Sequence, residues 1–138
     1  MITVDLAHRL HDAGLEWTPA AGDRFVVPDR DLDDEVFVIS EMTIEAHQLE
    51  TGGIVRFNGT TEWALDSIEQ SEVLWLPHEA QLRALLGGEF RRLEALPDGF
   101  VVVLRDEAYD GRGGRHLDVD AERAYARALL AVLQRPAT

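Results

Sequence analysis

The chain lacks lysine and cysteine, and these two absences exclude several kinds of chemistry. All 13 basic residues among its 138 are arginine. A nucleotide-binding P-loop uses a lysine to reach the transferred phosphate. A Schiff base requires a lysine amine, and a thiol nucleophile requires cysteine. Carboxylate, imidazole and hydroxyl chemistry remain, but no strong motif for any of them is present. We therefore predict no catalytic residues and no cofactor.

Positive charge is scarce as well. The 26 acidic residues outnumber the arginines two to one and give a formal net charge of −13. A field of this sign repels phosphate backbones and anionic lipid surfaces, so we expect neither nucleic-acid nor membrane binding. The sequence contains no run of 18 apolar residues, so we expect no membrane span. Residues 1–14 lack the continuous apolar stretch of a signal peptide, so a cytoplasmic location is the expectation.

Helix signals are strongest near the two ends of the chain. Thr3 can cap a helix that ends at Gly14, and Asp120 can cap a final helix that Pro136 stops. Two short central helices are expected, over residues 62–68 and from Pro77 to the glycines at 87–88. The acidic residues 29–35 are interpreted as a solvated connector.

Strands are expected between these helices, with connections short enough for hairpins. A turn at 97–99 separates two of them. The class is therefore α+β, with antiparallel sheets packed against helices in one domain over residues 1–138. The expected strands cover residues 24–27, 36–40, 42–47, 54–57, 90–96, 100–105 and 115–119, and residues 73–76 form a compact apolar run.

Alternating polar residues near the C-terminus suggest a possible metal site. His116, Asp118 and Asp120 are spaced two apart and would share one face of a strand. The competing interpretation explains each residue separately: Leu117 and Val119 point to the core, and Asp120 caps the last helix. We favour this second interpretation and predict no metal ligands.

Four other sets of polar residues are candidate sites. Glu45 and His47 share a strand face and would complete the site above if their strand lay beside residues 115–119. His8, His11 and Asp12 have helical metal-binding spacing, but a solvated helix face explains them better. The acidic stretch from Asp29 departs from a calcium loop at its sixth and twelfth positions. The three serines at 40, 67 and 71 lie outside any nucleophile motif.

Trp63 is the best candidate for a contact with another protein. It lies beside Glu62 and Asp66 in an expected short polar helix, so part of its ring would be exposed. A tryptophan surrounded by acids suits an anchor for an apolar pocket with a basic rim. The competing interpretation is that the Trp63 ring seals the sheet and belongs to the core. Trp75 lies in an apolar run and is expected in the core.

Several stretches together resemble a family of short actinobacterial proteins. They are residues 57–68 (FNGTTEWALDSI), Leu74-Trp-Leu-Pro77 with Gln81-Leu82, and residues 23–28 (DRFVVP). Many members carry the label "pilus assembly protein CpaE". Pilus-assembly proteins of that name have an ATPase domain with a lysine-bearing phosphate loop, which this chain lacks. The resemblance therefore implies an actinobacterial origin and no catalytic residues.

Two functions follow as expectations. The first is a small non-enzymatic module that binds a protein partner with a basic surface, through Trp63, Glu62 and Asp66. The alternative is a small metal-binding protein or metal-dependent hydrolase that uses strand-borne histidine and aspartate. The alternative requires the side chains of His47 and His116 to converge. The oligomeric state is left open.

Overall fold

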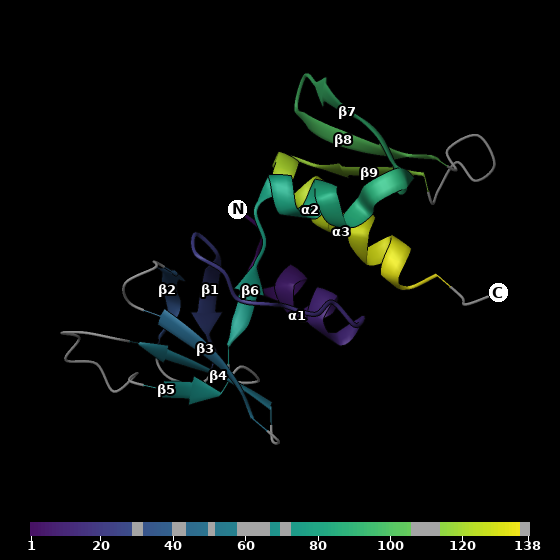
Figure 1. Cartoon of the computed structure of the whole chain (residues 1–138). Helices are drawn as coiled ribbons and strands as arrows, with labels where there is room; N and C mark the ends of the chain where they lie inside the picture. The colour runs from purple at the N-terminus through teal and green to yellow at the C-terminus, as the bar shows by residue number, and fades with distance from the viewer. Residues whose placement is uncertain are drawn as a thin grey trace. The chain divides into compact units, whose positions relative to one another are not determined.

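The computed structural model describes residues 1–28, 32–39, 44–49, 52–57, 67–69, 73–105 and 114–135. The class is α+β, as predicted, and the strand pairs formed by these residues are all antiparallel (Figure 1). The helices are α1 (Val4–Asp12), α2 (Glu79–Leu86) and α3 (Ala121–Leu133), with a 3-10 turn η2 (Gly87–Glu89) after α2. The strands are β1 (Arg24–Val27), β2 (Leu32–Val38), β3 (Ile44–Leu49), β4 (Gly52–Phe57), β5 (Ser67–Glu69), β6 (Leu74–Leu76), β7 (Phe90–Leu96), β8 (Gly99–Leu104) and β9 (Arg115–Asp118).

The chain divides into two compact units. Unit 1 comprises Met1–Glu16 and Pro77–Thr138, and unit 2 is the segment between them, Trp17–Leu76. No segment with the composition of a linker marks either boundary, so the sequence alone did not predict the division. The expectation of one domain concerns independent folding and stays a prediction.

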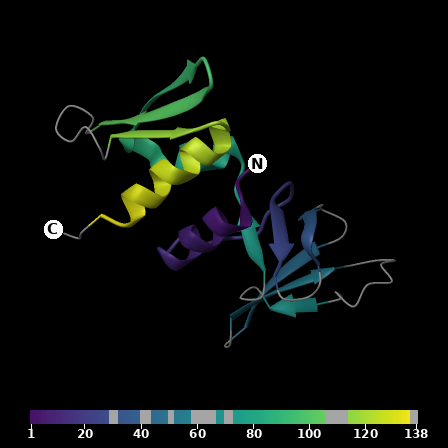
Figure 2. The same cartoon turned by 180° about the vertical axis from the view of Figure 1, so that it is seen from behind.

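Unit 1 is a three-stranded sheet, in the order β7-β8-β9, packed against helices (Figures 1 and 2). α3 packs on β8 and β9, while α1 and α2 pack on α3. The central strand β8 is fully buried from Val101 to Leu104. The ring of Tyr125 on α3 meets the ring of Phe90 at a centroid distance of 5.5 Å. Burial in this apolar layer supplies the main stabilisation of unit 1.

The ends of α1 carry the signals expected from the sequence. The Thr3 side chain accepts a hydrogen bond of 3.1 Å from the Leu6 N–H. At the other end, the N–H of Leu15 donates to the carbonyl of Leu10, and that of Gly14 donates to His11. This pair of bonds is a Schellman motif, and Gly14 adopts the positive φ of 104° that it requires.

The predicted start of α2 was two positions too early. His78 is the N-cap, and its N–H donates to the Gln81 side chain at 2.8 Å in a capping box. Pro77 therefore precedes the cap instead of occupying the first helical position. Its fixed φ still suits a chain that enters a helix.

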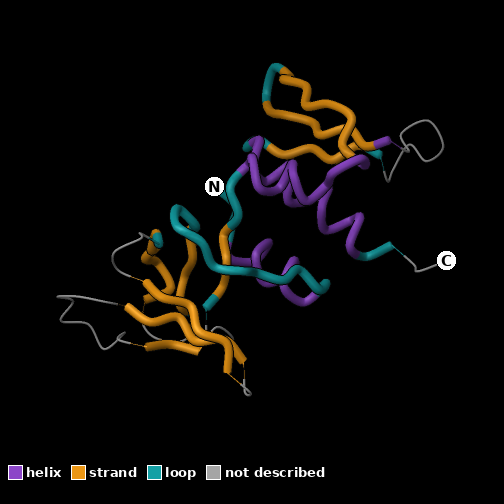
Figure 3. Tube along the Cα trace, in the orientation of Figure 1, coloured by secondary structure: helices purple, strands orange, loops and turns teal. Residues whose placement is uncertain are grey.

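Unit 2 contains two three-stranded sheets, in the orders β2-β1-β6 and β3-β4-β5 (Figure 3). The first has a core of Phe25, Val27, Ile39 and Val73, with Trp17 and Phe37 packed against it. The second has a regular register from Ile44 opposite Phe57 to Leu49 opposite Gly52. For β3, β4 and β5 only the backbone is described.

One expectation for unit 2 is wrong, and another concerns residues that mostly lie outside the described ranges. β2 begins at Leu32, so the acidic residues 33–35 are part of a strand and not of a connector. Aspartate and glutamate have low strand propensity, but the pairing of Leu32 with Val27 holds the start of β2 in the sheet and overrides this preference in residues 33–35. Most of the expected helix at 62–68 lies outside the described residues, and its last two residues, Ser67 and Ile68, belong to β5.

The apolar residues of β9 face the opposite way from the prediction. Leu117 is 56% exposed, and Val119, which follows the strand, is 69% exposed. Asp118 is the residue turned toward α3, where Arg127 donates to it. The alternation of faces was correct, but the position of α3 buries the polar face and leaves the apolar one open.

Candidate functional site

The residues predicted as a partner-binding site, Trp63, Glu62 and Asp66, lie outside the described residues. They belong to the segment that forms unit 2. Their role as an anchor therefore stays a prediction. The described residues of the same unit show its charge and the exposed side chains of β2.

The two units differ sharply in charge. Unit 2 holds 13 acidic residues against three arginines, a formal net charge of −10. Unit 1 holds the same number of acidic residues but ten arginines, a formal net charge of −3. Most of the net charge thus belongs to 60 residues in the middle of the chain. Such a concentration attracts cationic surfaces and raises the rate at which they associate.

β2 is an outer strand of unit 2 that combines this charge with exposed apolar side chains. β1 lies between β2 and β6, so only one edge of β2 is paired within this sheet. Val36 is 39% exposed and Val38 is 58% exposed, while Phe37 between them stacks on Phe25 at 5.4 Å. The acidic residues 33–35 precede Val36 on the same strand. The acidic residues and the exposed valines are therefore consecutive along one outer strand.

The register of β2 against β1 shifts between Leu32 and Phe37, in the part of the strand where the acidic residues meet the apolar ones. Arg24 and Phe25 pair with Val38 and Phe37, but Val27 pairs with Leu32, which leaves a bulge between these pairs. The end of the strand is held in place because the Ile39 N–H donates to the carbonyl of Asp23 at 2.9 Å. Bulges bend a strand and re-aim its side chains.

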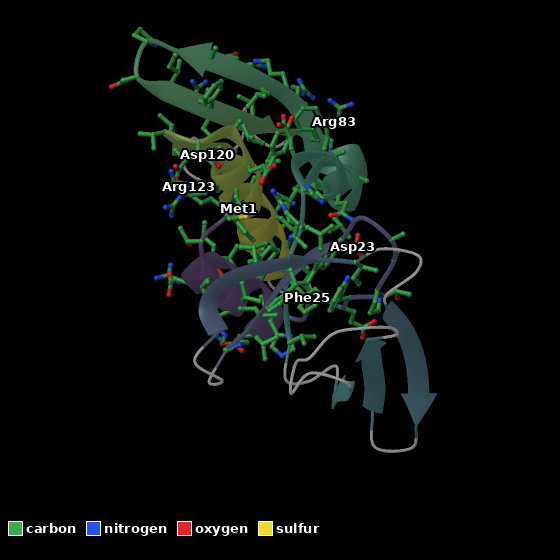
Figure 4. The ribbon with its side chains drawn as sticks, turned by 90° about the vertical axis from the view of Figure 1, so that its left-hand side faces the viewer. Met1, Asp23, Phe25, Arg83, Asp120 and Arg123 are labelled. Atoms are coloured by element: carbon green, nitrogen blue, oxygen red, sulfur yellow. The ribbon has the colours of Figure 1, made fainter. Side chains whose placement is uncertain are left out.

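Asp23 fixes the loop that supports this sheet. The residue is 4% exposed, and its carboxylate accepts hydrogen bonds from the Trp17 indole N–H at 2.8 Å and the Ala20 N–H at 3.0 Å. The Trp17 ring in turn stacks on Trp75 at 6.2 Å, with 10° between the ring planes. Trp75 is partly buried in this stack rather than fully enclosed. Asp23 and Phe25 are labelled in Figure 4.

Asp118 and Asp120, which were candidates for the disfavoured metal site, have roles within unit 1. The Asp118 carboxylate accepts a hydrogen bond of 2.8 Å from Arg127 and lies 3.3 Å from Arg123. Asp120 is the N-cap of α3, because its carboxylate accepts from the Arg123 N–H at 3.0 Å. The Met1 ammonium lies 3.4 Å from the same carboxylate; Figure 4 labels Met1, Asp120 and Arg123. The interpretation of Asp120 as a helix cap is thus confirmed.

The electrostatic environment of Asp118 favours its charged form. Burial alone would raise the pKa of this carboxyl. The hydrogen bonds from Arg127 and from the Asp120 N–H, together with the two arginine charges, outweigh burial and lower the pKa below its usual value of 3.8. A carboxylate engaged in this way holds β9 against α3.

The other candidate metal residues do not form a described site. His47 and Glu45 lie on β3 in unit 2, whereas His116 lies on β9 in unit 1. His8, His11 and Asp12 are exposed on α1, as expected for a solvated face. Within the described ranges, no three histidine, aspartate or glutamate residues could jointly hold a metal ion. In the same part of the chain, no helix has the length and apolar character to cross a bilayer.

Comparisons with family models, with curated proteins and with solved structures found no match for this chain. The resemblance carried by residues 57–68 and 23–28 therefore stays a prediction.

Proposed function

We propose that the chain is a protein-interaction module whose acidic unit 2 binds a basic surface on a partner protein. The charge asymmetry between the units carries this proposal, because it directs a cationic partner to unit 2 and not to unit 1. The described residues also include an outer strand, β2, on which acidic and exposed apolar residues adjoin.

The chemistry of β2 indicates the form of the partner. An extended segment can add to the outer edge of a sheet through main-chain hydrogen bonds, with side chains supplying specificity. Basic side chains of such a segment would meet residues 33–35, and apolar ones would meet Val36 and Val38. A second copy of this chain does not suit β2, since its own acidic residues would repel it. Trp63, with Glu62 and Asp66, is proposed as an additional aromatic anchor in the same unit.

The proposal is tested by capturing partners from a lysate of the source organism with the immobilised full-length chain. We expect a basic protein, bound in stoichiometric amount, that is released as salt is raised. Neutralisation of Asp33, Asp34 and Glu35 to their amides should weaken its binding at least tenfold. Neutralisation of Asp5, Asp12 and Glu16 is the matched control, because it removes three exposed charges from unit 1. Equal loss of binding in both triple variants would contradict a site on unit 2.

The anchor role of Trp63 is tested separately with Trp63→Ala. An anchor predicts a melting temperature within about 2 °C of the wild type and loss of the captured partner. A large fall in melting temperature would place the indole in the core and remove it from the proposed site.

A further inference from the structure

Each unit has a hydrophobic core built from its own residues. In unit 2, Phe25, Val27, Ile39 and Val73 are buried together, and the two aromatic side chains packed against them belong to the same unit. In unit 1, α1 and α2 pack on α3, and α3 packs on the buried strand β8. A segment that has a core of its own can unfold without its neighbour.

Unit 2 is an insertion in unit 1. The chain passes from one unit to the other only at residues 16–17 and 76–77. α1 precedes the insertion and still packs on α3, with Leu6 and Leu10 buried. If unit 2 opened, its residues would form a loop between α1 and α2, and the closure cost of a loop grows only with the logarithm of its length. Unit 1 can therefore stay folded while unit 2 opens.

Charges in unit 1 form ion pairs that join its elements. Asp118 on β9 pairs with Arg127 on α3 at 2.8 Å. Glu89 of η2 lies 3.3 Å from Arg105, which follows β8, and 3.0 Å from Arg135, near the end of α3. The arginines of these pairs are partly exposed, so salt screens their attraction. Added salt should leave the stability of unit 1 unchanged or slightly lower.

Charge in unit 2 acts in the opposite direction. Its 60 residues carry a formal net charge of −10. The folded unit confines these charges to a small volume, whereas an unfolded segment spreads them apart. Repulsion among them therefore lowers the stability of the folded form. Salt screens this repulsion, so it should stabilise unit 2.

We infer that unit 2 is a charge-controlled folding unit, which opens at low ionic strength while unit 1 stays folded, and which positive counter-charge closes. The control arises from the net charge of the whole unit and not from one acidic residue. It does not depend on the proposed partner site at β2, although a basic partner would supply counter-charge of the same kind. Separate unfolding would replace the expected single domain by two.

The inference is tested by urea unfolding of the full chain at about 10 mM and about 150 mM NaCl, between which the Debye length falls from about 30 Å to about 8 Å. Urea is uncharged and does not itself screen. All three tryptophans, at positions 17, 63 and 75, belong to unit 2, so their fluorescence reports on this unit. Amide exchange of β8 at the same urea concentrations reports on unit 1.

At low salt, the tryptophan transition should occur at a lower urea concentration than the loss of protection in β8. Higher salt should raise the midpoint of the tryptophan transition and leave that of β8 unchanged or slightly lower. Spermine, a tetravalent cation, should also raise the tryptophan midpoint when it is added at constant ionic strength, because multivalent counter-charge neutralises the unit more effectively than sodium.

Two triple variants distinguish net charge from a local contact. One carries Asp33→Asn, Asp34→Asn and Glu35→Gln, and the other carries Glu41→Gln, Glu45→Gln and Glu50→Gln. Each removes the same charge from a different part of unit 2, so both should raise the tryptophan midpoint at low salt and reduce its salt dependence. The matched control neutralises the acidic residues at 5, 12 and 16 of unit 1 and should leave this midpoint unchanged.

Coincident transitions of the tryptophans and β8 at both salt concentrations would overturn separate unfolding. A tryptophan midpoint that does not respond to salt would overturn control by charge, and so would a rise confined to one of the two triple variants. These outcomes leave the partner site at β2 untouched, because no partner is present in the measurements. Loss of the captured partner from the variant at 33–35 tests that site alone.

Discussion

The carboxylate of Asp118 on β9 accepts a 2.8 Å hydrogen bond from the guanidinium of Arg127 on α3. This contact turns the polar face of the strand inward and leaves Leu117 exposed on the other side. The packing of α3 on β9 therefore determines which side chains of this strand unit 1 exposes.

The Asp118 contact predicts a specific dependence of stability on pH. Asp118→Asn should lower the free energy of unfolding at pH 7 by about 1–2 kcal/mol, because it removes a charge-assisted hydrogen bond. The folded-state pKa lies below 3.8, so the carboxylate stabilises the fold above its unfolded pKa. This contribution is lost as the pH falls through the folded-state pKa.

Urea unfolding of wild type and Asp118→Asn at pH 7 and at several values below pH 4 measures this effect. The difference between the two proteins should shrink as the pH falls below 3.8. Asp5→Asn is the control, because its ion pair with Arg9 is exposed and should contribute under about 0.5 kcal/mol. A difference between wild type and Asp118→Asn that stays constant with pH would show that the charge of Asp118 is not stabilising.

Gly99 is required by close approach of the backbone and not by a positive φ. A Cβ at this position would lie 2.7 Å from the Asp118 carbonyl oxygen, a backbone atom that cannot rotate away. Gly99→Ala should therefore destabilise the fold by about 1–3 kcal/mol. At Gly88 a Cβ would meet nothing within 4 Å, so Gly88→Ala should be neutral or slightly stabilising. Thermal melts of the two variants compare them directly, and equal melting temperatures would contradict the steric argument.

The cap of α3 can be separated from the charge of Asp120. Asp120→Ala should cost about 1 kcal/mol, because the Arg123 N–H loses its acceptor. Asp120→Asn keeps an acceptor but removes the ion pair with the Met1 ammonium. Chemical denaturation should show a clear loss of unfolding free energy for Asp120→Ala and a much smaller loss for Asp120→Asn. If both variants lost equal stability, the charge would be the main contribution and the cap a minor one.

Asp23 should be the most sensitive polar residue in unit 2. Asp23→Ala removes the acceptor of two hydrogen bonds, from the Trp17 indole and from the Ala20 N–H, and should cost about 2–3 kcal/mol. Asp23→Asn retains an acceptor oxygen and should cost less. Tryptophan fluorescence during unfolding reports on this site through the stacked Trp17 and Trp75 rings. An unchanged denaturation midpoint in Asp23→Ala would contradict the structural role.

The sequence predicted elements whose ends are marked by local chemistry. Thr3 marks the start of α1, Gly14 marks its end, and Asp120 marks the start of α3. Sequence signals of this kind are readable because caps act within one turn of the helix. β1 and β7 were predicted at their observed bounds from apolar and turn residues alone.

What the sequence did not predict depends on contacts between distant residues. The extension of β2 through residues 33–35 requires the pairing of Leu32 with Val27. The exposed face of Leu117 depends on the side of the sheet that α3 covers, and a period of two does not specify that side. The charge difference between the units could be counted only after the contacts had defined where each unit begins and ends.

The central claim is that a basic partner binds the acidic unit 2 at β2. Hydrogen–deuterium exchange of the full chain, with and without the captured partner, tests it most directly. The account predicts slower exchange in Leu32–Val38 on binding and unchanged exchange in Phe90–Leu96 of unit 1. Protection confined to unit 1, with β2 exchanging as fast as in the free chain, would contradict it.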